Sequence, residues 1–460
     1  MATGLFFKQA LTNQGWVYDI SVSISEDGHI RAIDQDNNPN CYPVIENPVV
    51  PGMPNLHSHS FQYAMAGLSE VRRNPVDSFW SWREMMYYFA HNVSPSELQA
   101  ITAKLYMELL KGGYTEVVEF HYLHNDMDGS YYAQTEELST AIITASDQTG
   151  LSLTHLPVFY AHANFGGVAP QDAQRRFINS RDQYLKLIEI LKSNQNQASY
   201  NLGLAPHSLR AVTEDEMAWL LDLRDNLLPD CPVHIHVAEQ TKEVDDSVAY
   251  NGKRSVTALM DQAPVDSAWC LIHSTHLDDE EVSAIASSGA TVGLCPLTES
   301  NLGDGIFRAI DFLNDGGHFG IGSDSNICTQ ATQELRTLEY SQRLLHRQRN
   351  VLCSEKMPNV GSNLWQLAAT GGARATGRKI GQISVGSRAD FVELKFDRNG
   401  IMAAVSPQAV LDFHIFSGQK ADIGDVYVAG KKVLTSGKHP LEETINTAYV
   451  SAIQRLAHKL

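Results

Sequence analysis

Short apolar runs alternate with amphipathic stretches along the middle of this chain. Between the apolar runs lie helical periods such as residues 94–113, which open on Ser94-Pro95 and close on Gly112-Gly113. The runs themselves have the length and residue types of buried strands, and they lie at residues 49–59, 115–124, 151–160, 200–209, 232–240, 268–277, 291–297 and 319–325. Eight such units predict an α/β fold, a (β/α)8 TIM-type barrel. A doubly wound open sheet is the alternative, but the sequence contains no glycine-rich phosphate loop.

Both ends of the chain have a different pattern, which is typical of strands without long helices. Residues 1–50 alternate between apolar and polar positions or are rich in β-branched residues, with a hairpin turn at Glu26-Asp27-Gly28. Strand patterns return at residues 381–397 and 424–437. We therefore predict a small β-sandwich domain built from residues 1–50 and 379–440. The barrel is predicted over residues 51–378, and a C-terminal helix over residues 441–460.

Composition and charge narrow the classes of partner. The 460 residues have a formal net charge of −18, which argues against nucleic acids and anionic membrane surfaces, although a pocket can still be locally basic. The six cysteines are scattered and mostly lie in apolar runs, which indicates reduced thiols rather than disulfides or a cysteine-type zinc site. The sequence starts without a signal-peptide pattern and has no apolar run long enough for a bilayer, so we expect a cytoplasmic protein.

Polar residues suited to chemistry stand where several of the predicted strands end. His57 and His59 lie two apart, so on a strand their imidazoles point to one side. His236 and Glu239, His273 and Asp324 end later strands, and in a barrel functional groups belong at these carboxyl ends. Imidazoles with a carboxylate are suitable ligands for Zn²⁺ or a similar divalent ion. Taken singly, each histidine could also be a structural core residue, and His234 shares a strand face with His236.

The motifs PGMPNLHSH, HIHVAE, IHSTHL, GSDS and GQISVGSRADFVEL resemble those of the amidohydrolase superfamily over nearly the whole chain. No lysine lies near the end of the fourth strand, so the two-metal arrangement with a carbamylated lysine is not expected. The resemblance implies a single-metal deaminase with one divalent ion per subunit, Zn²⁺ being expected and Fe²⁺ the alternative. The implied metal ligands are His57, His59, His236 and Asp324, and the implied catalytic residues are Glu239, His273 and Asp324.

A further set of motifs, which includes NLHSHSFQYAMAGL, FWSWREMMYYF and LCPLTESNLGDGIF, narrows this resemblance. It is similar to the superfamily members that hydrolyse N-formimino-L-glutamate to N-formyl-L-glutamate and ammonia in histidine degradation. The resemblance implies that substrate is bound by Gln62, Arg83, Tyr122, His207 and Arg210. Two guanidinium groups suit a small dianionic substrate derived from an amino acid, because each can hold a carboxylate with two hydrogen bonds.

Other interpretations stay open at this point. A deaminase or chlorohydrolase of a purine, an adenosine derivative or a triazine would use the same metal set, but it would have little use for two carboxylate receptors. Composition alone allows Arg83 to be a surface arginine stacked on neighbouring aromatic rings, and Arg210 to be a surface charge. A barrel that has lost catalysis and serves as a scaffold is the remaining class. We expect a homodimer, since symmetric dimers are the commonest assembly.

Overall fold

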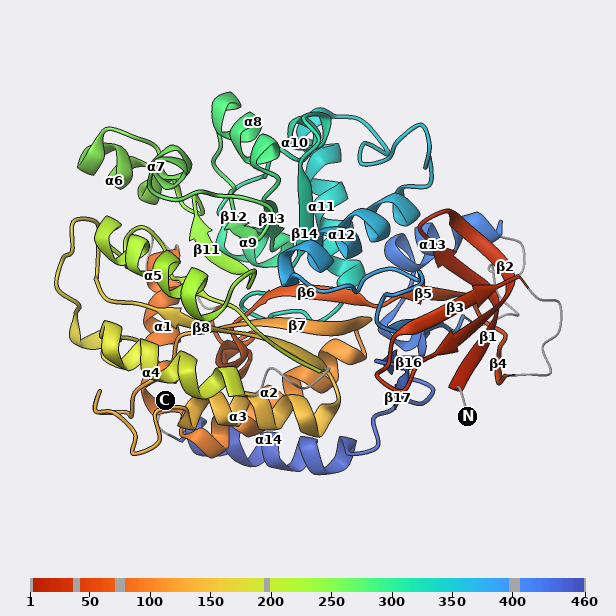
Figure 1. The fold of residues 1–460 in the computed structure, drawn as a ribbon, viewed down its shortest axis with the longest axis horizontal. Coiled ribbons are helices and arrows are strands. Elements are labelled where there is room, and N and C mark those ends of the chain that lie inside the picture. Colours follow the sequence, from red (N-terminus) through yellow and green to blue (C-terminus); the bar gives the residue numbers. More distant parts are fainter. Residues whose placement is uncertain (1–2, 36–41, 71–78, 194–198, 397–405, 459–460) are drawn as a thin grey trace.

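Two sheets organise the protein, a barrel and a smaller sheet at one end of it (Figure 1). The computed structural model describes residues 3–35, 42–70, 79–193, 199–396 and 406–458. No helix within these ranges combines the length and the apolar character that crossing a bilayer requires.

Parallel strands form the barrel, in which strands that follow one another in sequence pair along most of the ring and the last strand returns to the first. Ile321 of the last strand pairs with Asn55 of the first, and a parallel bridge from Leu204 to Val233 joins the two halves. The strands are β6 (Met53–Ser58), β7 (Tyr114–His121), β8 (Ser152–Phe159), β9 (Tyr200–Leu202), β10 (Ala205–Pro206), β11 (Val233–Val237), β12 (Trp269–His273), β13 (Thr291–Leu294) and β14 (His318–Ile321). Strands β9 and β10 both pair with β8 and together fill one of the eight strand positions around the barrel. The predicted (β/α)8 barrel is therefore confirmed.

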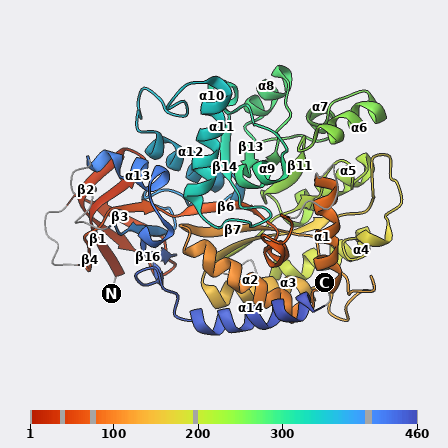
Figure 2. The same ribbon diagram turned by 180° about the vertical axis from the view of Figure 1, so that it is seen from behind.

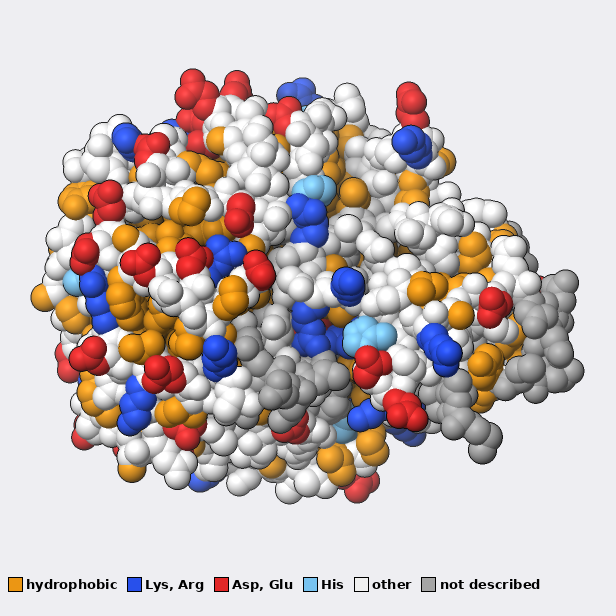
Figure 3. All heavy atoms as spheres, viewed as in Figure 1, with side chains coloured by type: hydrophobic (Ala, Val, Ile, Leu, Met, Phe, Trp, Pro, Cys, Tyr) orange, Lys and Arg blue, Asp and Glu red, His pale blue; other side chains and the backbone are white. Residues whose placement is uncertain are grey.

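Amphipathic helices cover the outside of the barrel, one or two after each strand. The first begins at Pro95 as predicted, because the Ser94 side chain and Glu97 form a capping box around its free backbone groups. Figure 3 shows charges of both signs on their outer faces, with hydrophobic side chains gathered over α4 and α5. The helices are α2 (Pro95–Leu110), α3 (Glu137–Thr149), α4 (Arg181–Lys192), α5 (Glu214–Leu227), α6 (Thr241–Asn251), α7 (Ser255–Gln262), α8 (Asp279–Ser288), α9 (Pro296–Leu302), α10 (Ala309–Asn314) and α11 (Ala331–His346).

The remaining helices close the barrel at its ends and along one side. Helix α12 packs against β6 and β14 so closely that a Cβ on Gly371 would lie 1.8 Å from the Phe319 carbonyl oxygen. Helix α14 lies along α2, as both ribbon views agree (Figures 1 and 2). The bounds are η2 (Ser60–Met65), α1 (Phe79–Asn92), η3 (Asp172–Gln174), α12 (Val360–Thr376), η6 (Pro407–Ala409), α13 (Val410–Phe416), η7 (Lys420–Asp422) and α14 (Glu442–Ala457).

The small domain draws its strands from both ends of the chain. They are β1 (Thr3–Thr12), β2 (Gly15–Ile24), β3 (Ile30–Asp34), β4 (Val44–Ile45), β5 (Val49–Pro51), β15 (Phe391–Leu394), β16 (Ile423–Val428) and β17 (Lys431–Leu434). Strand β5 joins the two sets, since it pairs parallel with β1 and antiparallel with β15. The expected sandwich is thus one hydrogen-bonded sheet of eight strands, whose own apolar cluster includes Phe7, Val22 and Phe391. The residue boundaries predicted for the units stay a prediction.

A buried ion cluster fastens the small domain to the barrel. Glu116 of β7 accepts a hydrogen bond of 2.8 Å from Nη2 of Arg388 and one of 2.6 Å from Thr154. The same guanidinium group forms a bidentate pair with Asp390, which directly precedes β15. All three charged side chains are at most 2% exposed. Because the charges are desolvated, the cluster is stable only while both carboxylates keep their cation.

We expect Arg388→Met to lower the free energy of unfolding by about 3–5 kcal/mol, because it removes the bidentate partner of buried Asp390 and leaves Glu116 with the longer ion pair of 3.4 Å to Arg378. Urea unfolding followed by circular dichroism measures the loss. Arg181→Met is the matched control, since the Arg181–Asp215 ion pair lies at the surface with side chains 39% and 85% exposed. The control should cost less than about 1 kcal/mol. Equal effects of the two substitutions would contradict a stabilising role for the buried cluster.

Candidate active site

Three strand ends bring three histidines and a carboxylate to one point above the barrel core. His57 lies in β6, His59 directly after it, His236 in β11, and Asp324 in the loop after β14. Nε2 of His236 lies 3.0 Å from Nε2 of His57, and Oδ1 of Asp324 lies 3.4 Å and 3.3 Å from Nε2 of His57 and His59. Ligand atoms of His57, His236 and His273 also lie within 4.8 Å of one another. All five side chains are buried.

The donor set fits a divalent metal ion. Nδ1 of His59 donates to the Phe120 carbonyl at 2.9 Å, and Nδ1 of His236 donates to the His207 carbonyl at 3.1 Å. In both rings the Nε2 lone pair therefore points toward the cluster. Metal-bound histidines likewise donate a hydrogen bond from the ring nitrogen that does not bind the metal. Nε2 of His57 lies 3.0 Å from Nε2 of His236, and Nδ1 of His57 has no hydrogen-bond partner among the described residues, so these two Nε2 atoms can share either a proton or a bound cation. Around a tetrahedral zinc ion, ligand nitrogens at ~2.0–2.1 Å from the metal are about 3.3 Å apart.

The structure separates His234 from His236, which share a strand face. Nε2 of His234 donates to the carbonyl of Ala375 at 2.8 Å, near the end of α12. The imidazole of His236 instead lies 4.8 Å from that of His57, measured between ring centres. His236 therefore joins the histidine cluster and His234 lies in the layer below it, toward α12.

Backbone strain accompanies the strand ends at this site. Ala238, His273 and Asp324 have φ angles of 52°, 67° and 46°, in the left-handed region that non-glycine residues rarely occupy. Backbone bonds hold Asp324 there, since its N–H donates to the His57 carbonyl at 2.9 Å and its carbonyl accepts from the Asn326 side chain at 2.9 Å. This geometry turns the chain so that the carboxylate faces the histidines.

Glu239 and His273 lie beside the same cluster. Nε2 of His273 is 3.7 Å from Oε1 of Glu239 and 3.9 Å from Oδ2 of Asp324. Burial raises the pKa of Glu239 to about 7, so this carboxyl group can hold a proton near neutral pH. Burial by itself lowers the pKa of His273, but the Glu239, Glu299 and Asp324 carboxylates outweigh it and raise the pKa to about 10. The pair thus combines a carboxyl group and an imidazole, both suited to proton transfer.

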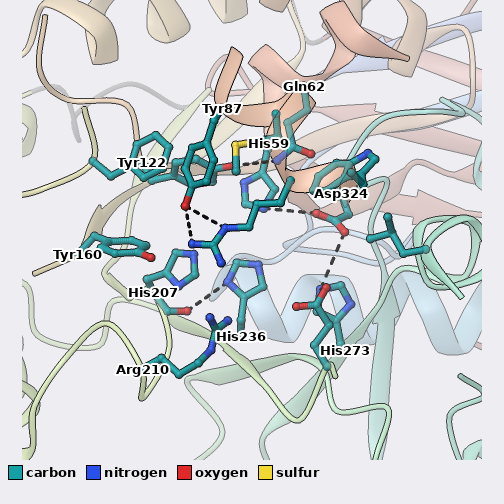
Figure 4. A pocket seen from close by; sticks show the side chains of 16 residues that line it. His59, Gln62, Tyr87, Tyr122, Tyr160, His207, Arg210, His236, His273 and Asp324 are labelled. Atoms are coloured by element: carbon teal, nitrogen blue, oxygen red, sulfur yellow. Dashed lines mark hydrogen bonds and ion pairs between the residues drawn. The ribbon is translucent and has the colours of Figure 1, made fainter. Parts of the chain in front are cut away.

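A pocket of about 650 Å³ opens above these groups. Figure 4 shows the labelled side chains converging on it from several strand ends and from α1. All five residues predicted to bind substrate line this pocket together with His59, His236, Glu239, His273 and Asp324: they are Gln62, Arg83, Tyr122, His207 and Arg210. The structure therefore brings together residues that lie far apart in the sequence.

The polar lining is arranged around two guanidinium groups. Nε of Arg83 donates to the Tyr87 hydroxyl at 2.9 Å, and Gln62 donates to the Tyr122 hydroxyl at 2.7 Å. Nε of Arg210 is buried and has no hydrogen-bond partner among the described residues. Two cations that share a small pocket make it locally basic within an acidic protein, which favours an anionic ligand.

Three residues of the site were not assigned there from the sequence. The Tyr87 hydroxyl accepts a hydrogen bond from Arg83 one helical turn away, a spacing that could have indicated the pair. Tyr160 also lines the pocket, with its ring 4.5 Å from that of His207. Glu299 lies behind His273, and no local pattern signals that contact because it depends on how α9 packs.

A model described as the amidohydrolase family matches residues 49–433. The chain belongs to the amidohydrolase family. It is 46% identical to a formimidoylglutamate deiminase of Pseudomonas aeruginosa over 454 residues, which cover 99% of each sequence. An amidohydrolase crystal structure from Brucella melitensis superposes with a TM-score of 0.92 at 45% identity, and the match covers 99% of this chain and 100% of that one.

An adenosine deaminase from Xanthomonas campestris, solved with bound zinc, has a TM-score of 0.81 at 21% identity over 99% of this chain and 98% of that one. At that identity the likeness concerns the fold alone. Amidohydrolase family membership, together with the histidine and aspartate cluster, makes this chain a hydrolase with a candidate site for a divalent metal.

Proposed function

We propose that this chain hydrolyses N-formimino-L-glutamate to N-formyl-L-glutamate and ammonia. One observation carries the proposal: Arg83 and Arg210 line the same pocket as Glu239, His273 and the histidine–aspartate cluster. The 46% identity to the Pseudomonas aeruginosa formimidoylglutamate deiminase over nearly the full length of both chains supports the same substrate.

The binding half of the proposal rests on charge and shape. The glutamate part of the substrate carries two carboxylates, and a guanidinium group can hold a carboxylate with two parallel, charge-assisted hydrogen bonds. Arg83 and Arg210 would each receive one carboxylate, and Gln62, Tyr122 and His207 would add single hydrogen bonds. The formimino group would then lie toward Glu239 and His273.

One divalent ion per subunit would be held by His57, His59, His236 and Asp324, whose inward-facing donor atoms fit it. We expect zinc, with ferrous iron as the alternative, because a nitrogen and oxygen ligand set accepts both ions. When bound, such an ion acidifies a water molecule and polarises the carbon–nitrogen group that the water attacks. A homodimer and a cytoplasmic location stay predictions from the sequence.

The residues around the cluster would move the protons. His273, which carries a proton at neutral pH, would pass it to Glu239 and then, with Asp324, take the proton that the water loses as it adds to the formimino carbon. Glu239 would donate its proton to the nitrogen that departs. The second proton of the water would reach that nitrogen through the same groups. The bond from carbon to nitrogen then breaks, ammonia leaves, and the oxygen from water becomes the formyl oxygen.

The test of the proposal is ammonia release by the Zn²⁺-loaded protein from three compounds, N-formimino-L-glutamate, N-formimino-glycine and adenosine. Turnover is expected with the first compound. The glycine derivative has the reacting group but lacks the side-chain carboxylate, so its kcat/KM should be lower by roughly 10- to 100-fold, the loss of one charge-assisted contact. Turnover of adenosine alone would favour the ring deaminase, and purified protein without bound metal or turnover would favour a scaffold.

Arg210→Met serves as the control variant in this assay. It should raise KM for N-formimino-L-glutamate, because Arg210 lines the pocket. Bound metal should stay unchanged, because Arg210 makes no hydrogen bond or ion pair with the clustered histidines among the described residues. An unchanged KM would remove Arg210 from the substrate contacts.

A further inference from the structure

A buried carboxylate lies directly behind His273, on the side of the ring that faces away from the pocket. Oε1 of Glu299, in helix α9, is 3.3 Å from Nδ1 of His273. Glu299 is 5% exposed and His273 is 1% exposed, so water does not compete for this contact. Nε2, at the other side of the same ring, faces Glu239 and Asp324.

We propose that Glu299 is a positioning residue, which acts on the reaction by holding the imidazole of His273 in one tautomer and one orientation. This inference rests on the proposed function, in which His273 handles the proton of the attacking water. It adds a residue to that function, because Glu299 does not line the pocket. Among the described residues it makes no hydrogen bond or ion pair with the proposed metal ligands His57, His59, His236 and Asp324.

The two nitrogens of the His273 ring have different partners, and this decides where the ring exchanges its proton. A carboxylate accepts and never donates, so Glu299 keeps a proton at Nδ1 whether the ring is charged or neutral. The ring therefore gains and loses its proton at Nε2, which faces Glu239 and Asp324. Proton transfer by an imidazole requires such a fixed point of exchange.

One backbone hydrogen bond holds the Glu299 carboxylate, and a second contact holds the helix that carries it. The same Oε1 accepts the backbone N–H of Cys295 at 2.9 Å, which ties the carboxylate to the end of strand β13. The Thr298 hydroxyl lies 2.9 Å from that of Ser325, next to Asp324 in the loop after β14. Helix α9 therefore connects the carboxylate behind His273 to the loop that carries Asp324, and the carboxylate cannot swing away without breaking backbone contacts.

A second buried acid nearby makes a matched control. Glu334 of α11 is also fully buried and accepts a backbone N–H, that of Leu297, at 2.9 Å. No hydrogen bond or ion pair joins it to His273 among the described residues. Replacing either glutamate removes a buried carboxylate from the same region, but only Glu299→Gln changes the partner of the His273 ring.

The kinetic test is a double-mutant cycle in the Zn²⁺-loaded protein with N-formimino-L-glutamate. Glu299→Gln should lower kcat by about 10- to 100-fold, the usual cost of losing a group that orients a site residue. KM and bound metal should be unchanged, and Glu334→Gln should keep kcat within about twofold. In a His273→Asn background, adding Glu299→Gln should change kcat by less than about twofold, because the ring on which it acts is absent. An equal loss in both backgrounds would overturn the positioning role.

A second readout does not depend on turnover. In protein labelled with ¹⁵N-histidine, the His273 ring signals are those that disappear in His273→Asn. At a pH high enough for the His273 ring to be neutral, we expect its remaining proton at Nδ1 in the wild type and in Glu334→Gln, and at Nε2 in Glu299→Leu. Unchanged ring signals in Glu299→Leu would overturn the inference. If the wild type releases no ammonia, the proposed substrate fails, and the tautomer of His273 still tests the role of Glu299.

Discussion

Glu239→Gln is expected to lower kcat for N-formimino-L-glutamate by about 10²- to 10⁴-fold, the range for the loss of one general acid. Glutamine has the same shape but cannot deliver a proton to the nitrogen that leaves. Burial favours the protonated form of Glu239 near neutral pH, which is the form that this step needs. Bound metal should stay at one ion per subunit, because Glu239 is not one of the proposed metal ligands. Ammonia release and elemental analysis measure the two effects separately.

The control for this variant is Glu216→Gln. Glu216 forms the capping box at the start of α5 and does not line the pocket, so its substitution should leave kcat within about twofold. A near-normal rate in Glu239→Gln would show that another group supplies the proton. Loss of metal together with activity would instead assign Glu239 to the metal site.

The second large effect is expected from His236→Ala, which should reduce bound metal to a small fraction of one ion per subunit and abolish turnover. Removing His236 deletes one of the inward-facing nitrogens, and its Nε2 lies 3.0 Å from that of His57. A site with one donor fewer binds a divalent ion much more weakly. Elemental analysis after dialysis against a metal-free buffer gives the occupancy.

His234→Ala is the matched comparison, two residues away on the same strand. His234 is fully buried and donates to the Ala375 carbonyl below the site, so its loss should cost about 2–5 kcal/mol of stability but no metal. Equal metal contents in the two variants would mean that the ion is held without His236.

Much of the fold follows from local sequence patterns. The alternation of buried strands with capped amphipathic helices predicted the barrel, and the start of α2 at Pro95 follows from Ser94 and Glu97 alone. Strand periodicity also predicted that His57 and His59 would act together. These features need only neighbouring residues, and their physical causes are hydrogen bonding within a helix turn and the two-residue repeat of a strand.

The sequence by itself therefore determined the class of fold, the strand ends that carry the site and, through its resemblance to a family, the residues to look for. Strand periodicity leaves both His234 and His236 open, and the resemblance implied His236. The tertiary structure gives the physical distinction, since His236 lies beside His57 and His234 donates to the Ala375 carbonyl. It also placed Arg83 beside Arg210 and Glu299 behind His273. Such contacts join distant segments, and they depend on how strands and helices pack, which no local pattern encodes.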